Sequence, residues 1–243
     1  SFGDHLDKES RYRRTGEFLD VIKRSWSGEI YDYEGEFFQL DQGGLRRGLG
    51  DQEIPQVYFG GASPPGLDVA SRYADVYLTW GEPLDAVAEK VRVIKEMAAG
   101  KGRSIRAGLR IHIITRDTEE EAWVEADRII AGLDPAEVEK ARERFSRMES
   151  VGQAKMAELA HGGDDDLVIA PNLWAGIGLV REGAGTAIVG SHEQVAERLL
   201  DYRDVGIDEF ILSGYPHLEE ALRFGEYVRP LVDQATQPVL PSL

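Results

Sequence analysis

Short runs of β-forming residues alternate with helical stretches along this chain, and this alternation limits its fold more than any other feature. The runs cover residues 54–61, 74–80, 106–115 and 208–215. The stretch between the second and third runs carries apolar residues at helical spacing and ends at Gly100. Strands that alternate with helices of this length predict an α/β protein built from parallel β/α units. Two architectures fit this pattern, a doubly wound sheet and a (β/α)₈ barrel.

Three helix starts are marked by capping residues. Thr118 is followed three residues later by Glu121, and Ser191 by Gln194, which is the pattern of a capping box. Asp134 precedes a proline, and an N-cap acid followed by proline is typical of a helix start. We therefore expect helices to begin at these three points.

The regular alternation is interrupted over residues 134–190. This segment ends in an apolar, glycine-rich stretch, 170–190 (APNLWAGIGLVREGAGTAIVG). Long connections inside a compact domain are commonly functional or mobile. We interpret residues 134–190 as an insertion that carries a mobile loop.

Composition excludes several classes of protein. Hydrophobic residues make up 42% of the 243, which is enough for a full core. Lys and Arg number 28 against 44 Asp and Glu, a net charge of -16, which argues against nucleic acid or a membrane surface as partner. There is no cysteine, no apolar run of about 18 residues and no signal-peptide pattern. We expect a cytoplasmic protein. The first residue is Ser1 rather than Met, so we expect a processed chain or a fragment.

In either architecture, binding groups gather at the carboxyl ends of the strands. At one such end, Gly60 and the candidate residues Gly61, Ala62 and Ser63 precede a helical run. Small residues let backbone N–H groups approach a phosphate, and the serine adds a hydroxyl. An ordinary βα turn is the alternative. At the next strand end, Trp80 could form the wall of a flat cofactor site, or simply pack in the core.

A second group of candidates combines cations with imidazole and phenol. Arg110 and His112 lie two apart on one strand and therefore share a face, where they would suit an anion. The alternative places both outside the barrel, paired with acids. Arg181 lies in the glycine-rich stretch and could close over an anion, unless it pairs with Glu182. Tyr215 lies at a strand end and could donate to a reacting oxygen.

No metal site is predicted. The chain has no His-x₃-His or comparable ligand spacing, and it has no Gly-x-Ser-x-Gly nucleophile elbow, Walker loop or GxGxxG fingerprint.

Several motifs at the strand ends carry a family resemblance. They are YFGGAS, DVYLTWGEP, IRAGLRIHIITRDT, SVGQAKMAEL, the stretch 170–190 and DEFILSGYPHLEEA. Together they resemble the FMNH₂-dependent alkanesulfonate monooxygenases of the bacterial-luciferase-like flavin monooxygenases. The resemblance implies the (β/α)₈ TIM-barrel fold, with residues 1–243 forming one domain. That domain would supply mainly the C-terminal half of the barrel, its last four strands, with 134–190 as the insertion.

The resemblance also implies roles for the candidates. Ser63, with Gly61 and Ala62, would meet the phosphate of FMN, and Trp80 would lie near flavin and substrate. Arg110 and His112 would line the sulfonate pocket, and Tyr215 would complete its polar set. Arg181 would come from the mobile insertion and close over the substrate. Relatives have Gly where this chain has Glu182, which could weaken the preceding arginine.

The implied activity is a two-component monooxygenase that uses reduced FMN and O₂ to convert alkanesulfonates to aldehyde and sulfite. A separate NAD(P)H:FMN reductase would supply the reduced flavin, and the protein would form a homo-oligomer. Two alternatives stay open. One is a related enzyme for another small organosulfur compound or a deazaflavin-type cofactor, and the other is a non-catalytic flavin-binding half-barrel module.

Overall fold

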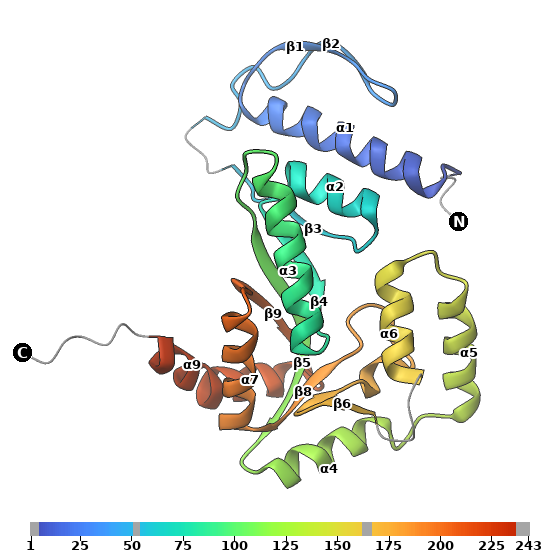
Figure 1. Cartoon of the computed structure of the whole chain (residues 1–243), viewed down its shortest axis with the longest axis vertical. Helices are drawn as coiled ribbons and strands as arrows, with labels where there is room; N and C mark the ends of the chain where they lie inside the picture. The colour runs from blue at the N-terminus through green and yellow to red at the C-terminus, as the bar shows by residue number, and fades with distance from the viewer. Residues whose placement is uncertain (1–4, 51–53, 162–166, 237–243) are drawn as a thin grey trace, which may run out of the picture. The chain divides into compact units, whose positions relative to one another are not determined.

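A computed structural model describes residues 5–50, 54–161 and 167–236 of the chain. The chain divides into two compact units, the first made of Ser1–Tyr77 with Ile94–Arg106 and the second of Leu78–Val93 with Ala107–Leu243. Figure 1 shows the elements of both units. Each unit is described here by itself.

The first unit combines two helices, a hairpin and short strands. Its elements are α1 (Lys8–Trp26), β1 (Tyr31–Glu34), β2 (Gln39–Gly43), β3 (Tyr58–Gly60), α2 (Pro64–Tyr73), the start of β4 (Val76–Trp80) and the end of α3 (Leu84–Ala99). The strands β1 and β2 pair antiparallel. A small core of alanine, tyrosine and isoleucine side chains joins α2, the start of β4 and the end of α3.

The second unit holds most of the described chain. Its elements are the end of β4, the start of α3, β5 (Arg106–Arg116), α4 (Glu119–Ile130), α5 (Pro135–Ser146), α6 (Val151–His161), β6 (Val168–Ala170), β7 (Leu173–Trp174), η1 (Gly176–Leu179), β8 (Ala187–Ser191), α7 (His192–Asp204), β9 (Glu209–Ser213), α8 (His217–Arg223), η2 (Phe224–Val228) and α9 (Arg229–Thr236).

The long strand β5 is the centre of the second unit. It pairs in parallel with both β8 and β9, as β/α units require. The apolar face of β5 packs against α3 and α7 in the main core, which includes Val91 and Leu199. In Figure 1, α4 lies along the strands next to β8, and α5 lies beside α6.

The predicted helix starts are confirmed. Ser191 and Gln194 form a reciprocal capping box at the start of α7. The side chain of Thr118 accepts from the backbone N–H of Glu121, and the side chain of Asp134 caps α5. The structure is α/β, as predicted, and the predicted capping residues mark these three helix starts.

Two predicted segments differ in detail from the structure. The run 54–61 contains the predicted strand, but only over Tyr58–Gly60 (β3). The stretch 170–190, the end of the predicted insertion 134–190, contains β7, η1 and β8. Its strands pair antiparallel: β6 with β7, and β7 with β8. That small antiparallel arrangement is absent from the predicted pattern of parallel units.

Candidate functional site

The alternation of β5 directs two polar side chains away from the main core. Leu109, Ile111 and Ile113 are buried in that core, so Arg110 and His112 occupy the opposite face of the strand. The His112 side chain is nevertheless buried, with 1% of its surface exposed. β5 continues beyond His112 to Arg116, so this histidine lies within the strand.

The edge of β5 changes its partner between these two residues. The carbonyl of Arg110 accepts from the N–H of Gly81 at the end of β4 (3.1 Å), whereas the N–H of His112 donates to the carbonyl of Thr186 before β8 (3.0 Å). The Thr186 hydroxyl donates to the carbonyl of Gly81 (2.8 Å) and joins the two strands. A Cβ at Gly81 would lie 2.4 Å from Ile111 Cδ1, so only glycine fits this junction. Arg110 and His112 therefore lie on β5 at the point where β4 ends and β8 begins.

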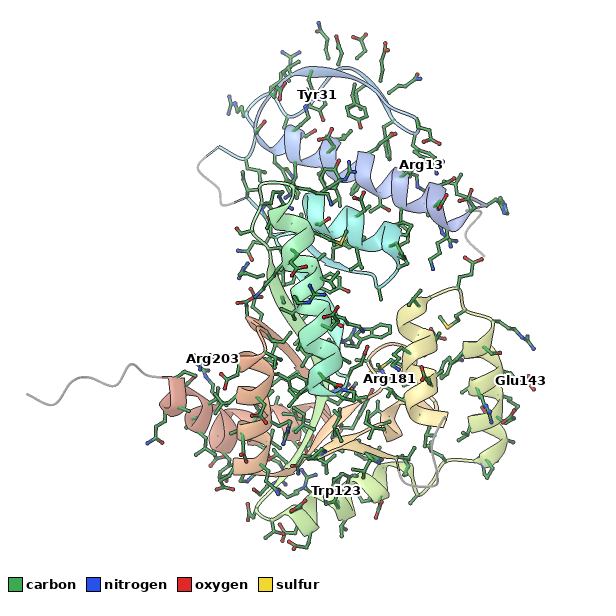
Figure 2. The ribbon with its side chains drawn as sticks, in the orientation of Figure 1. Arg13, Tyr31, Trp123, Glu143, Arg181 and Arg203 are labelled. Atoms are coloured by element: carbon green, nitrogen blue, oxygen red, sulfur yellow. The ribbon has the colours of Figure 1, made fainter. Side chains whose placement is uncertain are left out.

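Arg181 brings three predicted residues together. Its Nη1 lies 2.6 Å from His112 Nε2 and donates to the hydroxyl of Tyr215 at 2.6 Å. The His112 and Tyr215 rings stack, with centroids 5.5 Å apart and planes 14° apart. Arg181 follows η1 on the segment that leads to β8, and Figure 2 labels its side chain. We call His112, Arg181 and Tyr215, together with Arg110, the His112 centre.

The contact with Arg181 defines the state of His112. A guanidinium only donates, so Nε2 of His112 accepts and the neutral ring carries its proton on Nδ1. The pKa of His112 is lowered from 6.5 to about 4, first by burial and then by the charges of Arg181, Arg110 and His217, while the backbone of Thr186 acts in the opposite direction. His112 is therefore a neutral donor–acceptor at pH 7.

The His112 centre presents donors that have no protein acceptor. Nδ1 of His112 and Nε of Arg110 are buried and lack a hydrogen-bond partner among the described residues. The Tyr215 hydroxyl accepts from Arg181, so its own hydrogen is left for another acceptor. Buried donors without partners cost free energy, and a ligand with several acceptor oxygens would satisfy them. The arrangement suits an oxyanion.

The alternative for Arg181, a pairing with Glu182, is not what the structure shows. Glu182 Oε1 lies 3.0 Å from Nε of Arg144 on α5, and both side chains of that ion pair are about half exposed. Adjacent residues of an irregular segment point in different directions, so Glu182 turns to the insertion while Arg181 turns to the strands. The charge of Arg181 is left for the His112 centre.

Trp80 lies at the end of β4, as predicted, and is half-buried. Its ring adjoins two glycines of the insertion. A Cβ built on Gly152 of α6 would lie 3.1 Å from Trp80 Cζ3, and one built on Gly183 would lie 4.0 Å from Cζ2. Trp80 therefore lines the same insertion segment that carries Arg181.

The predicted phosphate turn belongs to the first unit. Ser63 precedes α2, is buried, and its hydroxyl has no hydrogen-bond partner among the described residues. It caps nothing, and the helix starts with two prolines that have no N–H to offer. An anion here would rely on the Ser63 hydroxyl and the backbone of Gly61 and Ala62. A Cβ on Gly61 would lie 3.2 Å from the hydroxyl of Tyr12, which the sequence did not single out.

Sequence reasoning also missed Gln153 of α6. This side chain is buried, and its Oε1 accepts from the backbone N–H of Gly183 at 2.9 Å. Glutamine is normally expected to face solvent, and although Gln153 lies in the motif SVGQAKMAEL, neither its residue type nor its spacing marked it as a contact of Gly183.

No group of three or more His, Asp or Glu residues in ranges 5–50, 54–161 and 167–236 could hold a metal ion. Within the same residues, every helix is too short or too polar to cross a membrane.

The fold is α/β, and the His112 centre holds buried donors without a hydrogen-bond partner among the described residues. A sequence model of the luciferase-like monooxygenase family matches residues 1–209. The chain therefore belongs to the luciferase-like monooxygenase family.

Solved structures share this fold at low sequence identity. Riboflavin lyase (RcaE), solved with modified FMN and riboflavin, is 17% identical, with a TM-score of 0.70 over 95% of this chain and 59% of its own. EDTA monooxygenase (EmoA) from Chelativorans sp. BNC1 is 22% identical, with a TM-score of 0.67, and the match covers 96% of this chain and 63% of EmoA. Long-chain alkane monooxygenase (LadA) is 18% identical, with a TM-score of 0.70, and the match covers 100% of this chain and 61% of LadA. The chain spans about three-fifths of the length of these proteins.

Proposed function

We propose that the protein is a two-component, FMN-dependent monooxygenase that desulfonates alkanesulfonates. Alkanesulfonate, O₂ and reduced FMN would give aldehyde, sulfite, oxidised FMN and water, with the C–S bond broken and its carbon oxidised. The observation that carries this proposal is the His112 centre, where Arg181 joins His112 and Tyr215 and leaves several donors open.

The donors of the His112 centre match a sulfonate. A sulfonate is a permanent anion with three acceptor oxygens, and arginine stays charged at any working pH and offers forked donors. Arg110 Nε, His112 Nδ1 and the Tyr215 hydroxyl supply three further N–H or O–H groups. Because His112 is neutral at pH 7, it adds a hydrogen-bond donor whose charge does not change near that pH. An uncharged substrate would leave these donors unsatisfied.

The residues present also fit a flavin mononucleotide. In the first unit, the unpartnered Ser63 hydroxyl and the backbone of Gly61 and Ala62 fit the phosphate of FMN. In the second unit, taken by itself, Trp80 offers a flat ring surface of the kind against which a flavin ring packs. Reduced FMN would supply the activation of O₂ when bound. The family membership and the modified FMN in the riboflavin lyase structure support this choice of cofactor. An NAD(P)H:FMN reductase and a second copy of this chain are the proposed partners.

A sulfite-release assay tests the proposal. The protein is mixed with FMN, NADH, a flavin reductase and octanesulfonate, and sulfite is quantified. We expect release that is lost in Arg110→Ala and Arg181→Ala. A parallel assay offers octane and dimethyl sulfone, which lack the anion. Binding of reduced FMN without sulfite from any alkanesulfonate contradicts the substrate assignment, and turnover of dimethyl sulfone instead favours another organosulfur compound.

A further inference from the structure

Three consecutive residues of the insertion point to three different parts of the second unit. Arg181 reaches His112 and Tyr215, Glu182 reaches Arg144 on α5, and the N–H of Gly183 reaches Gln153 on α6. Arg181 has no regular secondary structure around it to hold its backbone. A backbone hydrogen bond from the Gly178 N–H to the Gly185 carbonyl (2.8 Å) closes the segment around it, and within that segment its position depends on the contacts of its two successors.

Of these two contacts, the one to Gln153 is the better anchor. The Glu182 ion pair is about half exposed, and exposed pairs contribute little to holding a backbone. Gln153 is 2% exposed, and a buried amide must be hydrogen-bonded to be tolerated. A backbone N–H only donates, so Gly183 selects Oε1 as its partner and fixes the orientation of the amide.

The face of α6 that carries Gln153 is otherwise small or apolar. Gly152 adjoins Trp80, Met156 lies 3.8 Å from a Cβ built on Gly185, and Ala160 lies 3.1 Å from one built on Gly178. These residues follow helical spacing and cover the segment from η1 to β8. A polar side chain in this buried row has one evident use, which is its bond to Gly183.

We propose that Gln153 is a positioning residue for Arg181, which it holds against the His112 centre through the backbone of Gly183. The left-handed backbone of Gly183 (φ 92°) turns the chain immediately after Arg181, so the hydrogen bond fixes the turn from which the arginine projects. As a statement about catalysis, this inference rests on the proposed function. As a statement about the place of Arg181, it can be tested without substrate or cofactor.

The test uses His112 as a reporter in the full chain. The charged groups that act on His112 are Arg181, Arg110 and His217, and all three lower its pKa. Displacing Arg181 must therefore raise the pKa of His112 above about 4. The imidazole is titrated by NMR in Gln153→Leu, in Arg181→Gln and in the double variant, with His112→Gln to assign the signal. We expect both single variants to raise the pKa, and the double variant to match Arg181→Gln alone.

A matched control removes the same kind of bond elsewhere. Gln194 also accepts a backbone N–H through its side chain, from Ser191 at 2.8 Å, and it lies outside the His112 centre. Gln194→Leu is expected to leave the His112 titration unchanged. If Gln153→Leu does not fold, Gln153→Asn, which keeps the amide but is one carbon shorter, replaces it. The inference is overturned if the folded Gln153 variant leaves the His112 pKa at its wild-type value, or if Gln194→Leu shifts it equally.

An activity measurement separates this inference from the proposed function. We expect Gln153→Leu to lower kcat/KM for octanesulfonate between about ten- and a hundredfold, since small misplacements of a binding group have effects of that order. If neither wild type nor variants release sulfite while the His112 titration behaves as expected, the proposed function fails and the positioning role stands. Sulfite release at the wild-type rate by Gln153→Leu overturns the positioning role.

Discussion

Two buried histidines lie beside β5, and they differ in how their ring nitrogens are used. His192 begins α7; its Nδ1 lies 2.7 Å from the Thr115 hydroxyl and its Nε2 lies 3.2 Å from Asp117. Its ring also stacks on Tyr227, with centroids 4.7 Å apart. His112 stacks on a tyrosine as well, but its Nδ1 has no partner among the described residues.

The arginines next to the two histidines also differ in their hydrogen-bond partners. Near His192, Arg116 donates to the buried carboxylate of Glu220 (2.5 Å), and a second oxygen of Glu220 accepts from the N–H of Thr115 (3.3 Å). In the His112 centre, Arg181 has neutral partners, and no carboxylate is among the hydrogen-bond partners shown for it. We call Thr115, Arg116, His192 and Glu220 the His192 cluster. A cluster whose donors are matched by the protein holds structure together, and a centre with surplus donors is arranged for a ligand.

The largest expected effect is on activity and separates the two arginines. Arg181→Gln removes one of the two arginine charges of the His112 centre, and kcat/KM for octanesulfonate should fall about 10² to 10³-fold, as for removal of a strong oxyanion donor. Arg116→Gln, in the His192 cluster, should leave kcat/KM of the folded protein within about twofold. Steady-state sulfite release measures both. Equal losses in the two variants would break the contrast.

The next effect is on stability, where we expect the larger loss in the His192 cluster and the smaller loss in the His112 centre. Glu220→Ala leaves Arg116 without its buried partner, and it should lower the free energy of unfolding by about 3 kcal/mol. Arg181→Gln should change it by less than about 1 kcal/mol, since binding sites commonly tolerate loss of their charged groups. Urea denaturation followed by circular dichroism measures both values. A larger loss in Arg181→Gln would show that the His112 centre is structural.

The period of β5 made half of the His112 centre predictable. Arg110 and His112 share a face because side chains alternate along any strand, so two residues of the centre follow from local spacing. Arg181 comes from a segment 69 residues further on, and spacing along the chain does not reveal such a contact. Only the resemblance to a known family connected it with the strand.

The stretch 170–190 shows a limit of reasoning from sequence. The pattern of its glycines does not reveal that several of them permit close packing. A Cβ on Gly185 would lie 2.8 Å from the Cα of Gly178, and one on Gly176 would overlap the ring of Trp174. Glycine serves close approach as well as freedom, and tertiary structure decides between them. The same limit hid Gln153, whose burial depends on packing between segments far apart in the chain.

A third prediction concerns pH. His112 has a folded pKa of about 4 against 6.5 for the free side chain, so the unfolded state takes up a proton first as pH falls. Stability from this group is complete above pH 6.5 and is lost as pH falls towards about 4, with about 2 kcal/mol lost between pH 7 and pH 5. Urea denaturation at both pH values measures this loss. His112→Gln should reduce it, and an unchanged pH dependence in that variant contradicts the neutral buried state.

A fourth prediction uses the two stacked tyrosines. Tyr215→Phe keeps the ring against His112 but removes the acceptor of Arg181 and one open donor, and kcat/KM should fall about tenfold, the equivalent of about one hydrogen bond. Tyr227→Phe keeps the ring against His192, and its side chain is 43% exposed, so activity should stay within about twofold. Sulfite assays at matched concentrations of folded protein compare them. A loss in Tyr227→Phe as large as in Tyr215→Phe would remove the distinction between the two regions.

The smallest expected effect concerns the acid next to Arg181. If Glu182 neutralised Arg181, Glu182→Gln would strengthen sulfonate binding and lower KM. In the structure Glu182 pairs with Arg144 on α5, and the pair is about half exposed. Screening by solvent makes such a pair weak, so Glu182→Gln should change KM by less than about twofold, and Arg144→Gln should do the same. A clear fall in KM in Glu182→Gln alone would show that the charge of Glu182 reaches the His112 centre. Equal, small effects in both variants would leave the backbone hydrogen bond to Gln153 as the contact that orients Arg181.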